Sequence, residues 1–177
     1  FYEDDKESFD DYYKNNFLEK AGTFYNKLNE QNQAEIVTDH IVEYLKLSDN
    51  KKIINTRRAI IILKNDLIEE KLDPVGLVSI RIYHNFNLDG SININFTYIW
   101  RTVEVIVGLP YSMYGSICYS EYLLEKIIEK LKQVEDLKIN LKKIKLGNLT
   151  YIAQSLHMFR DNYSENIAKN IVDEATI

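Results

Sequence analysis

The segment from residue 77 to residue 101 constrains the fold more than any other part of this sequence, because its pattern is that of a long β-hairpin. Its centre, Leu88–Ser91, contains Asp89-Gly90, a pair that readily adopts the positive φ angles of a tight turn. The second arm alternates apolar and polar residues, which predicts one buried face and one more polar face. The apolar residues are Ile92, Ile94, Phe96 and Tyr98, and the polar residues are Asn93, Asn95 and Thr97.

Helices and further strands are expected on both sides of this hairpin. Apolar residues recur at helical spacing over residues 31–47, and an apolar stripe predicts a second helix from Pro110 to about Val134. The stripe consists of Tyr119, Leu123, Leu124, Ile127, Ile128 and Leu131. We also expect strands over residues 59–63 and 148–159, a basic connector over 138–145 and a last helix over 165–172. This order predicts one α/β (α+β) domain with a mixed sheet.

Three features lead to expectations about burial. Residues 59–63 are short and apolar enough for an interior strand. His84, in the first arm of the hairpin, is expected at the surface. Cys118, on a helix with Met113 and Ile117, is expected to be buried, because a free cysteine behaves as a small hydrophobic residue.

Composition narrows the class of protein. A chain of 177 residues, 45% hydrophobic and 28% charged, is typical of one globular domain. Its net charge of −5 argues against broad nucleic-acid binding, so we expect no nucleic-acid partner, although a local basic site is compatible with it. No apolar run approaches the ~20 residues of a membrane span, so no membrane partner is expected. The single cysteine excludes an internal disulfide and favours a reducing, cytoplasmic location.

The first 24 residues differ from the rest of the chain. Acidic residues alternate there with aromatic ones, which predicts a peripheral helix or arm with a solvated acidic face. The acids include Asp4, Asp5, Asp10 and Asp11, and the aromatic residues include Tyr2, Phe9, Tyr12, Tyr13 and Phe17. We assign residues 1–24 to this arm and residues 25–177 to the domain. Because the first residue is Phe1 rather than Met, we expect a fragment or a trimmed chain.

Two short basic segments are candidate anion sites. Arg101 and Thr102 follow the hairpin, and a guanidinium beside a hydroxyl at a strand end suits a phosphate. Glu104 and the turn at Gly108-Leu109-Pro110 come next. Arg57 and Arg58 precede the strand expected over residues 59–63.

These segments resemble the thymidylate synthases and their deoxycytidylate hydroxymethylase relatives. Residues 100–111 are similar to the family signature Arg-Ser/Thr-x-Asp/Glu-x-x-x-Gly-x-Pro-Phe/Tyr. Residues 56–65 are similar to its Ser-Arg-Arg segment and following strand, with Lys64 in place of a tryptophan. Residues 154–159 are similar to its His-x-Tyr segment, and Tyr25 lies where its Tyr-Gly motif provides a tyrosine. The resemblance extends from about Tyr25 to Val172.

The resemblance implies a thymidylate synthase-like fold, with helices packed on one face of a mixed sheet and a homodimer formed sheet to sheet. In that family, a nucleotide phosphate is held by residues matching Arg101 and Thr102 of one subunit and Arg57 and Arg58 of its partner. The remaining site residues carried over are Tyr25, His157 and Phe159 toward the sugar, Ser112 toward the base, and Glu104 toward the folate. Phe159 lacks the hydroxyl of the family's tyrosine, and Ser112 replaces an asparagine.

The family's catalytic cysteine has no counterpart here. Counting back from the turn puts Ser79 at its position, pairing across the hairpin gives Leu77, and adjacency to Pro74 gives Val75. A serine hydroxyl is a poor nucleophile without an adjacent base. The family's N-terminal part, with its proton-transfer glutamate, and its C-terminal strands and tail are also missing.

Three functions remain open from the sequence. The first is a catalytically impaired relative that binds a pyrimidine deoxynucleoside monophosphate or another phosphorylated ligand, as a sensor or a partner of other proteins. The second is an active methyl- or hydroxymethyltransferase that uses methylenetetrahydrofolate to modify carbon 5 of a pyrimidine nucleotide. The third is a structural dimer that binds no small ligand.

Overall fold

The computed structural model describes residues 28, 30–48, 55–63, 76–106, 108–158 and 162–175. The arm at residues 1–24 therefore lies outside the described residues. In chain order the elements are η2 (Glu30–Asn32), α3 (Gln33–Leu47), β1 (Ile60–Ile62), β2 (Leu77–Phe86), β3 (Ile92–Trp100), β4 (Val103–Glu104), α4 (Gly108–Lys132), η3 (Leu141–Lys143), β5 (Ile144–Ala153), β6 (Leu156–His157) and α5 (Asn162–Ala175).

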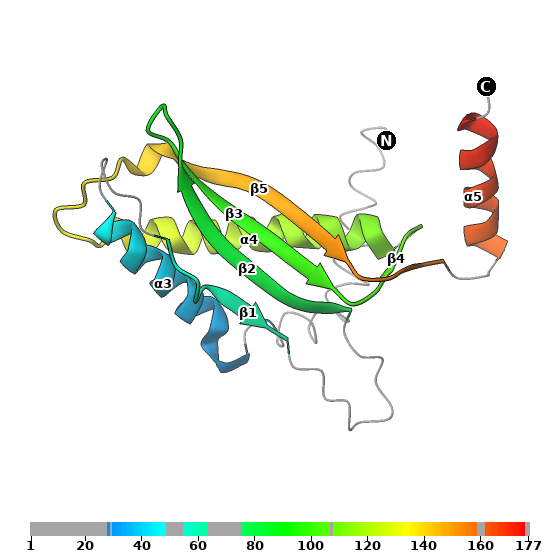
Figure 1. The fold of residues 1–177 in the computed structure, drawn as a ribbon, viewed down its shortest axis with the longest axis horizontal. Coiled ribbons are helices and arrows are strands. Elements are labelled where there is room, and N and C mark those ends of the chain that lie inside the picture. Colours follow the sequence, from blue (N-terminus) through cyan, green and yellow to red (C-terminus); the bar gives the residue numbers. More distant parts are fainter. Residues whose placement is uncertain are drawn as a thin grey trace.

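A four-stranded mixed sheet forms the centre of the fold, in the order β1-β2-β3-β5 (Figure 1). β2 and β3 are the predicted hairpin, and Gly90 in its turn has a φ of 75°. β5 pairs with β3 in parallel, so both strands finish at the same end of the sheet. The prediction of a mixed α/β fold is confirmed. β5 begins within the expected basic connector, and residues 154–155 separate it from the short β6.

One face of the sheet, the core face, is covered by α3 and α4 (Figure 1). Alternate residues of the hairpin point to this face, as the pattern predicted. The fully buried side chains include Ile80, Ile82, Ile94, Phe96 and Tyr98 from the strands, and Ile41, Leu45, Leu123 and Ile127 from the helices. The predicted α4 stripe is confirmed, since its members are buried or packed partly buried against the core.

The opposite face, here called the outer face, has no helix of the described chain packed along it. The residue rows across its four strands follow from the strand register. One row is largely apolar, with Ile62, Ser79, Ile99 and Ile152 as successive neighbours. Ile62 and Ile152 of this row remain 58% and 45% exposed. The rows nearer the hairpin turn are more polar: Ile60, Arg81, Thr97 and Thr150 form one row, and Asn85, Asn93 and Lys145 lie in another.

The expectation of an interior position for residues 59–63 is wrong, because β1 lies at an edge of this sheet. The Gln33 side chain occupies the free side of that edge. Its amide nitrogen donates to the Ile62 carbonyl at 3.0 Å, and its amide oxygen accepts from the Ile62 N–H at 2.8 Å. A side-chain amide thus replaces the backbone of a neighbouring strand, and it blocks the pairing that an exposed edge would invite.

Two burial expectations are also wrong. His84 is fully buried, because it shares the core-face phase of Ile80 and Ile82 and packs edge to face against Phe86 at 6.0 Å between ring centroids. Cys118 is exposed, because the buried stripe of α4 runs through Ser116, Tyr119 and Ser120 and leaves the neighbouring positions outside. In the part of the chain that the structure describes, no helix is both long and apolar enough to span a membrane.

Candidate functional site

Arg101 and Thr102 leave the sheet at the end of β3. The backbone N–H of Arg101 donates to the Gly76 carbonyl at 2.8 Å, next to the start of β2. A Cβ at Gly76 would lie 2.9 Å from the Thr102 carbonyl and 3.3 Å from the Trp100 ring, so only glycine permits this close approach. Arg101 itself is exposed and Thr102 is half-buried. The turn therefore presents the predicted cation and hydroxyl at the end of the sheet.

His157 joins Thr102 at this place. β4 and β6 form a short parallel pair in which Val103 lies beside Leu156 and Glu104 beside His157. Backbone N–H groups of Val103 and Val105 donate to the carbonyls of Ser155 and His157, both at 3.0 Å. The Thr102 Oγ1 lies 2.8 Å from the His157 Nδ1. Two residues assigned from separate motifs thus meet through their side chains.

Glu104 is turned toward the beginning of α4. One carboxylate oxygen accepts from the Ile106 N–H at 2.9 Å, and the other accepts from the Gly108 N–H at 2.7 Å. Amide groups at a helix start lack intrahelical partners, and a negative charge there is favourable. In this structure the carboxylate expected to face folate is hydrogen-bonded to the protein's own backbone and fixes α4 against β4.

Ser112 lies in α4, one turn after Gly108, and is half-buried. It lies near the Tyr151 side chain, and burial raises the pKa of the Tyr151 hydroxyl. The Tyr151 ring stacks on the Trp100 indole at 5.3 Å between centroids, with 22° between the planes. Sequence reasoning missed Trp100 and Tyr151 as neighbours of the site. Their contact depends on the parallel pairing of β3 and β5, which no local pattern reveals.

Arg57 and Arg58 do not approach Arg101 within one chain. Asn55 bonds to the His84 carbonyl through its side chain, and the Ala59 carbonyl accepts from the Ile82 N–H. Both arginines are therefore held beside residues 82–84 of β2, whereas Arg101 is held beside Gly76. Six residues of strand separate these levels, which corresponds to roughly 20 Å.

The two described positions that were considered for the catalytic cysteine, residues 77 and 79, carry no thiol. Leu77 is fully buried and pairs with Trp100, the residue that precedes Arg101, so the position nearest Arg101 holds an apolar side chain. Ser79 pairs with Ile99 and Ile62 in the apolar row of the outer face. Val75, Tyr25 and Phe159 lie outside the described residues. Within the described ranges, no group of three or more His, Cys, Asp or Glu side chains is arranged to hold a metal ion.

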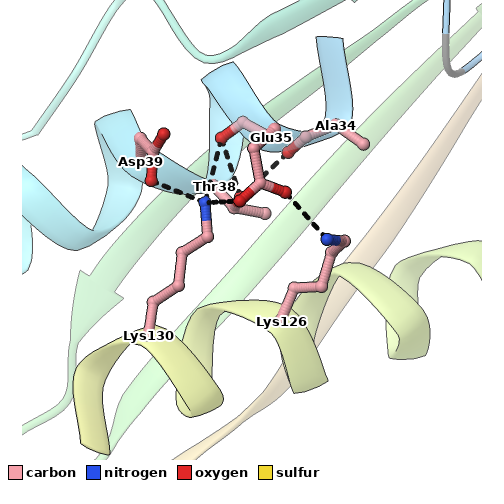
Figure 2. Close-up of polar contacts among 6 residues, drawn as sticks. All are labelled: Ala34, Glu35, Thr38, Asp39, Lys126 and Lys130. Atoms are coloured by element: carbon pink, nitrogen blue, oxygen red, sulfur yellow. Dashed lines mark hydrogen bonds and ion pairs between the residues drawn. The ribbon is translucent and has the colours of Figure 1, made fainter. Parts of the chain in front are cut away.

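A second polar cluster joins α3 to α4, the two helices that cover the core face of the sheet (Figure 2). The Glu35 carboxylate contacts the Nζ atoms of Lys126 at 2.8 Å and Lys130 at 2.7 Å, and Lys130 also contacts Asp39 at 2.5 Å. Hydrogen bonds from Lys126 and Lys130 lower the pKa of Glu35 to about 2. The adjoining groove measures about 530 Å³, and Lys46, Glu129, Gln133 and two valines complete its lining. Its acids and lysines neutralise one another, which is typical of a helix–helix contact.

Comparisons with known proteins add no assignment. No protein-family model matches the chain, and no curated protein matches it significantly.

Proposed function

We propose that this protein is a thymidylate synthase-like nucleotide-binding protein that lacks the family's chemistry. The observation that carries the proposal is the 2.8 Å contact between Thr102 and His157 beside Arg101. Arg101 and Thr102 were assigned from one motif toward the phosphate of a nucleotide, and His157 from another toward the sugar. Their meeting at one end of the sheet supports a single ligand site. A reducing, cytoplasmic location is part of the proposal, because the chain has one cysteine.

The chemistry of this cluster suits a phosphorylated sugar. A guanidinium donates two parallel hydrogen bonds to phosphate oxygens, and a threonine hydroxyl adds a short donor. The imidazole nitrogens of a histidine can donate or accept a hydrogen bond, as contact with a sugar hydroxyl requires. The ligand class is therefore a nucleoside monophosphate, with a pyrimidine deoxynucleotide implied by the family resemblance.

A homodimer forms the second part of the proposal. Arg57 and Arg58 lie roughly 20 Å from the level of Arg101 in one chain, so a shared anion requires a second copy. The outer face also carries exposed isoleucines, Ile62 and Ile152, in a row with Ile99. Sheet-to-sheet packing would bury this row. Opposed arginines across such an interface would repel one another unless an anion lay between them.

Catalysis by the family's route is not part of the proposal. It needs a thiolate at carbon 6 of the pyrimidine, whereas Leu77 and Ser79 occupy the candidate positions and Cys118 lies on the exposed side of α4. The described residues also do not fit methylenetetrahydrofolate. The Glu104 carboxylate is bonded to the Ile106 and Gly108 amides, so we derive no step through folate.

A thermal-shift titration tests ligand binding. We expect deoxyuridylate to raise the melting temperature of the full chain, and Arg101→Ala to abolish this rise. Lys132→Ala, which removes a cation from the exposed end of α4, serves as the matched control. A wild-type protein that responds to no nucleotide would overturn the proposal.

Mixing of variants tests whether two subunits share the site. Arg101→Ala and Arg57→Ala/Arg58→Ala are each expected to lose the nucleotide response. In a mixed dimer, one of the two sites combines intact residues from both chains, so mixing should restore part of the response. Light scattering should give the mass of a dimer. A monomeric mass, or no rescue on mixing, would remove the shared site.

The second candidate is a structural dimer that binds no small ligand. The hydrogen bonds from the Glu104 carboxylate to the start of α4 favour it, because they give this position of the family motif a structural role. In this case the arginines only make salt bridges. Saturating deoxyuridylate would then leave the arginine side-chain NMR signals unmoved. The transferase alternative is tested by tritium release from labelled deoxyuridylate with methylenetetrahydrofolate, and we expect no release.

A further inference from the structure

The two edges of the four-stranded sheet differ in how they are protected (Figure 1). At the β1 edge, the Gln33 amide bonds to the backbone of Ile62. At the β5 edge, no side chain of the described residues bonds to the backbone of residues 149–153. An edge without such a block can pair with another strand.

Within residues 149–153, alternate backbone groups point away from β3. The Gln154 N–H, just after β5, donates to the Trp100 carbonyl of β3 at 2.9 Å. Because successive residues of a strand direct their N–H and C=O groups to opposite sides, the even-numbered residues share this direction. The odd-numbered residues therefore face the free edge, where no described residue bonds to their backbone. They are Leu149, Tyr151 and Ala153.

Residues 149–153 also form a regular and uncharged stretch of strand. They pair with residues 96–100 of β3 without a register shift, whereas the irregularity of β5 lies before them. Their sequence, Leu-Thr-Tyr-Ile-Ala, contains no charged residue, glycine or proline. Natural edge strands use charges, prolines and bulges to prevent pairing. This part of β5 therefore has the composition of a strand that accepts a neighbour.

Side chains at this edge are less covered than those inside the sheet. On the core face, Leu149 and Tyr151 are partly buried, whereas Phe96 and Tyr98, beside them on β3, are 0% and 1% exposed. On the outer face, Ile152 is 45% exposed. A further strand beside β5 would bury apolar surface on both faces of the sheet.

The edge is complementary to a second copy of itself. In an antiparallel pair, two residues exchange hydrogen bonds only when the backbone groups of both point toward the other strand. A twofold axis at Tyr151 meets this condition, because Tyr151 then faces its own equivalent and Leu149 faces the equivalent of Ala153. A shift of the second strand by two residues in either direction would leave one of these residues without such a partner. Lys145, the one charged residue of β5, lies away from the axis.

We propose that residues 149–153 of two copies pair in antiparallel fashion about Tyr151 and join two sheets edge to edge. The contact leaves the outer face uncovered, so it is compatible with the face-to-face dimer of the proposed function and does not rest on it. Because a few residues of each strand make a small interface, we expect the pairing only at high protein concentration.

Amide exchange of the full chain, read by NMR at about 50 µM and about 1 mM protein, tests the pairing. At the higher concentration, exchange at Tyr151 should slow about tenfold, because its N–H gains a hydrogen bond. The amides of Thr150 and Ile152 point to β3, so they serve as internal controls and should not change. Packing between outer faces would not produce this alternation, since it adds no hydrogen bonds at the edge.

Two outcomes of this measurement would overturn the proposal. A Tyr151 amide that exchanges slowly at both concentrations would mean that the edge is paired within one chain. Equally fast exchange at both concentrations would mean that no second strand binds there.

Two charge variants test the register. Thr150 and Ile152 point to the outer face, and each stands opposite the equivalent of the other across the proposed axis, where like charges repel and opposite charges attract. Thr150→Lys/Ile152→Lys should therefore abolish the concentration-dependent protection at Tyr151. Thr150→Glu/Ile152→Lys should retain it, and about 0.5 M salt should weaken it.

The two variants control for one another. Both lose the same threonine and isoleucine side chains, so a general loss of stability, or a weaker contact between outer faces, would affect them alike. Equal exchange at Tyr151 in the two variants would overturn the proposed register.

Discussion

The Thr102 hydroxyl lies 2.8 Å from the Nδ1 atom of His157, although the two residues are 55 positions apart in the chain. The short parallel pair of β4 and β6 creates this contact, because it aligns the residues that follow β3 and β5. The same alignment brings Glu104 beside His157. The end of the sheet is therefore the place where the sequence motifs become one cluster.

Replacing Thr102 by valine should cost about 1 kcal/mol of unfolding free energy, since valine keeps the shape and loses the hydrogen bond to His157. Urea denaturation measures the loss, and the His157 ring signals in a ¹H–¹⁵N NMR spectrum should shift. Thr150→Val, at an exposed position of β5, is the control and should change neither. Unchanged His157 signals in Thr102→Val would contradict the contact.

Glu104→Gln should destabilise the protein by about 1 kcal/mol, because an amide group would face the N–H groups at the start of α4. Urea denaturation followed by circular dichroism gives the value. Glu121→Gln, on the exposed side of the same helix, should be neutral. If Glu104→Gln were equally neutral, the carboxylate would be free to meet a ligand, and the folate alternative would regain support.

Gln33→Ala should uncover the β1 edge. It removes two hydrogen bonds to Ile62, and we expect a loss of about 1 kcal/mol and a roughly five- to tenfold faster amide exchange at Ile62. Hydrogen–deuterium exchange read by NMR measures the second effect. Gln133→Ala, at an exposed position just after α4, provides the comparison. If the amide of Ile62 exchanged at the wild-type rate in Gln33→Ala, the Gln33 side chain would not protect the β1 edge.

The Glu35 cluster predicts a defined loss of stability in acid. The folded-state pKa of Glu35 is lowered to about 2 from 4.5, so its contribution is complete above pH 4.5 and disappears as the pH falls toward 2. Because water reaches 48% of the side chain, we expect only about 0.5–1 kcal/mol. Denaturation of wild type and Glu35→Gln across this range should converge at the acidic end. A constant difference would mean that the carboxylate charge does not stabilise the helix pair.

Local pattern was sufficient for several elements. The alternation at residues 92–98 and the Asp89-Gly90 pair predicted the hairpin, and the helical stripe of α4 was found by spacing alone. Both depend on interactions between near neighbours in the chain. His84 was misjudged although the signal was present, since it continues the two-residue phase of Ile80 and Ile82 toward the core.

Other features depended on partners far away in sequence. The edge position of β1 follows from which strands find one another, and its protection comes from a glutamine on a different element. The exposure of Cys118 depends on which side of α4 faces the sheet, and that is decided by packing against residues far away in sequence.

The sequence by itself determined the hairpin, the two long helices and the residue types able to hold an anion, because side-chain periodicity and turn chemistry act over a few residues. Only the tertiary structure decided which of them meet. It joined Thr102 to His157 and directed Glu104 to the start of α4. It also left Arg57 and Arg58 roughly 20 Å from Arg101, because strand pairing sets the distances between residues remote in the chain.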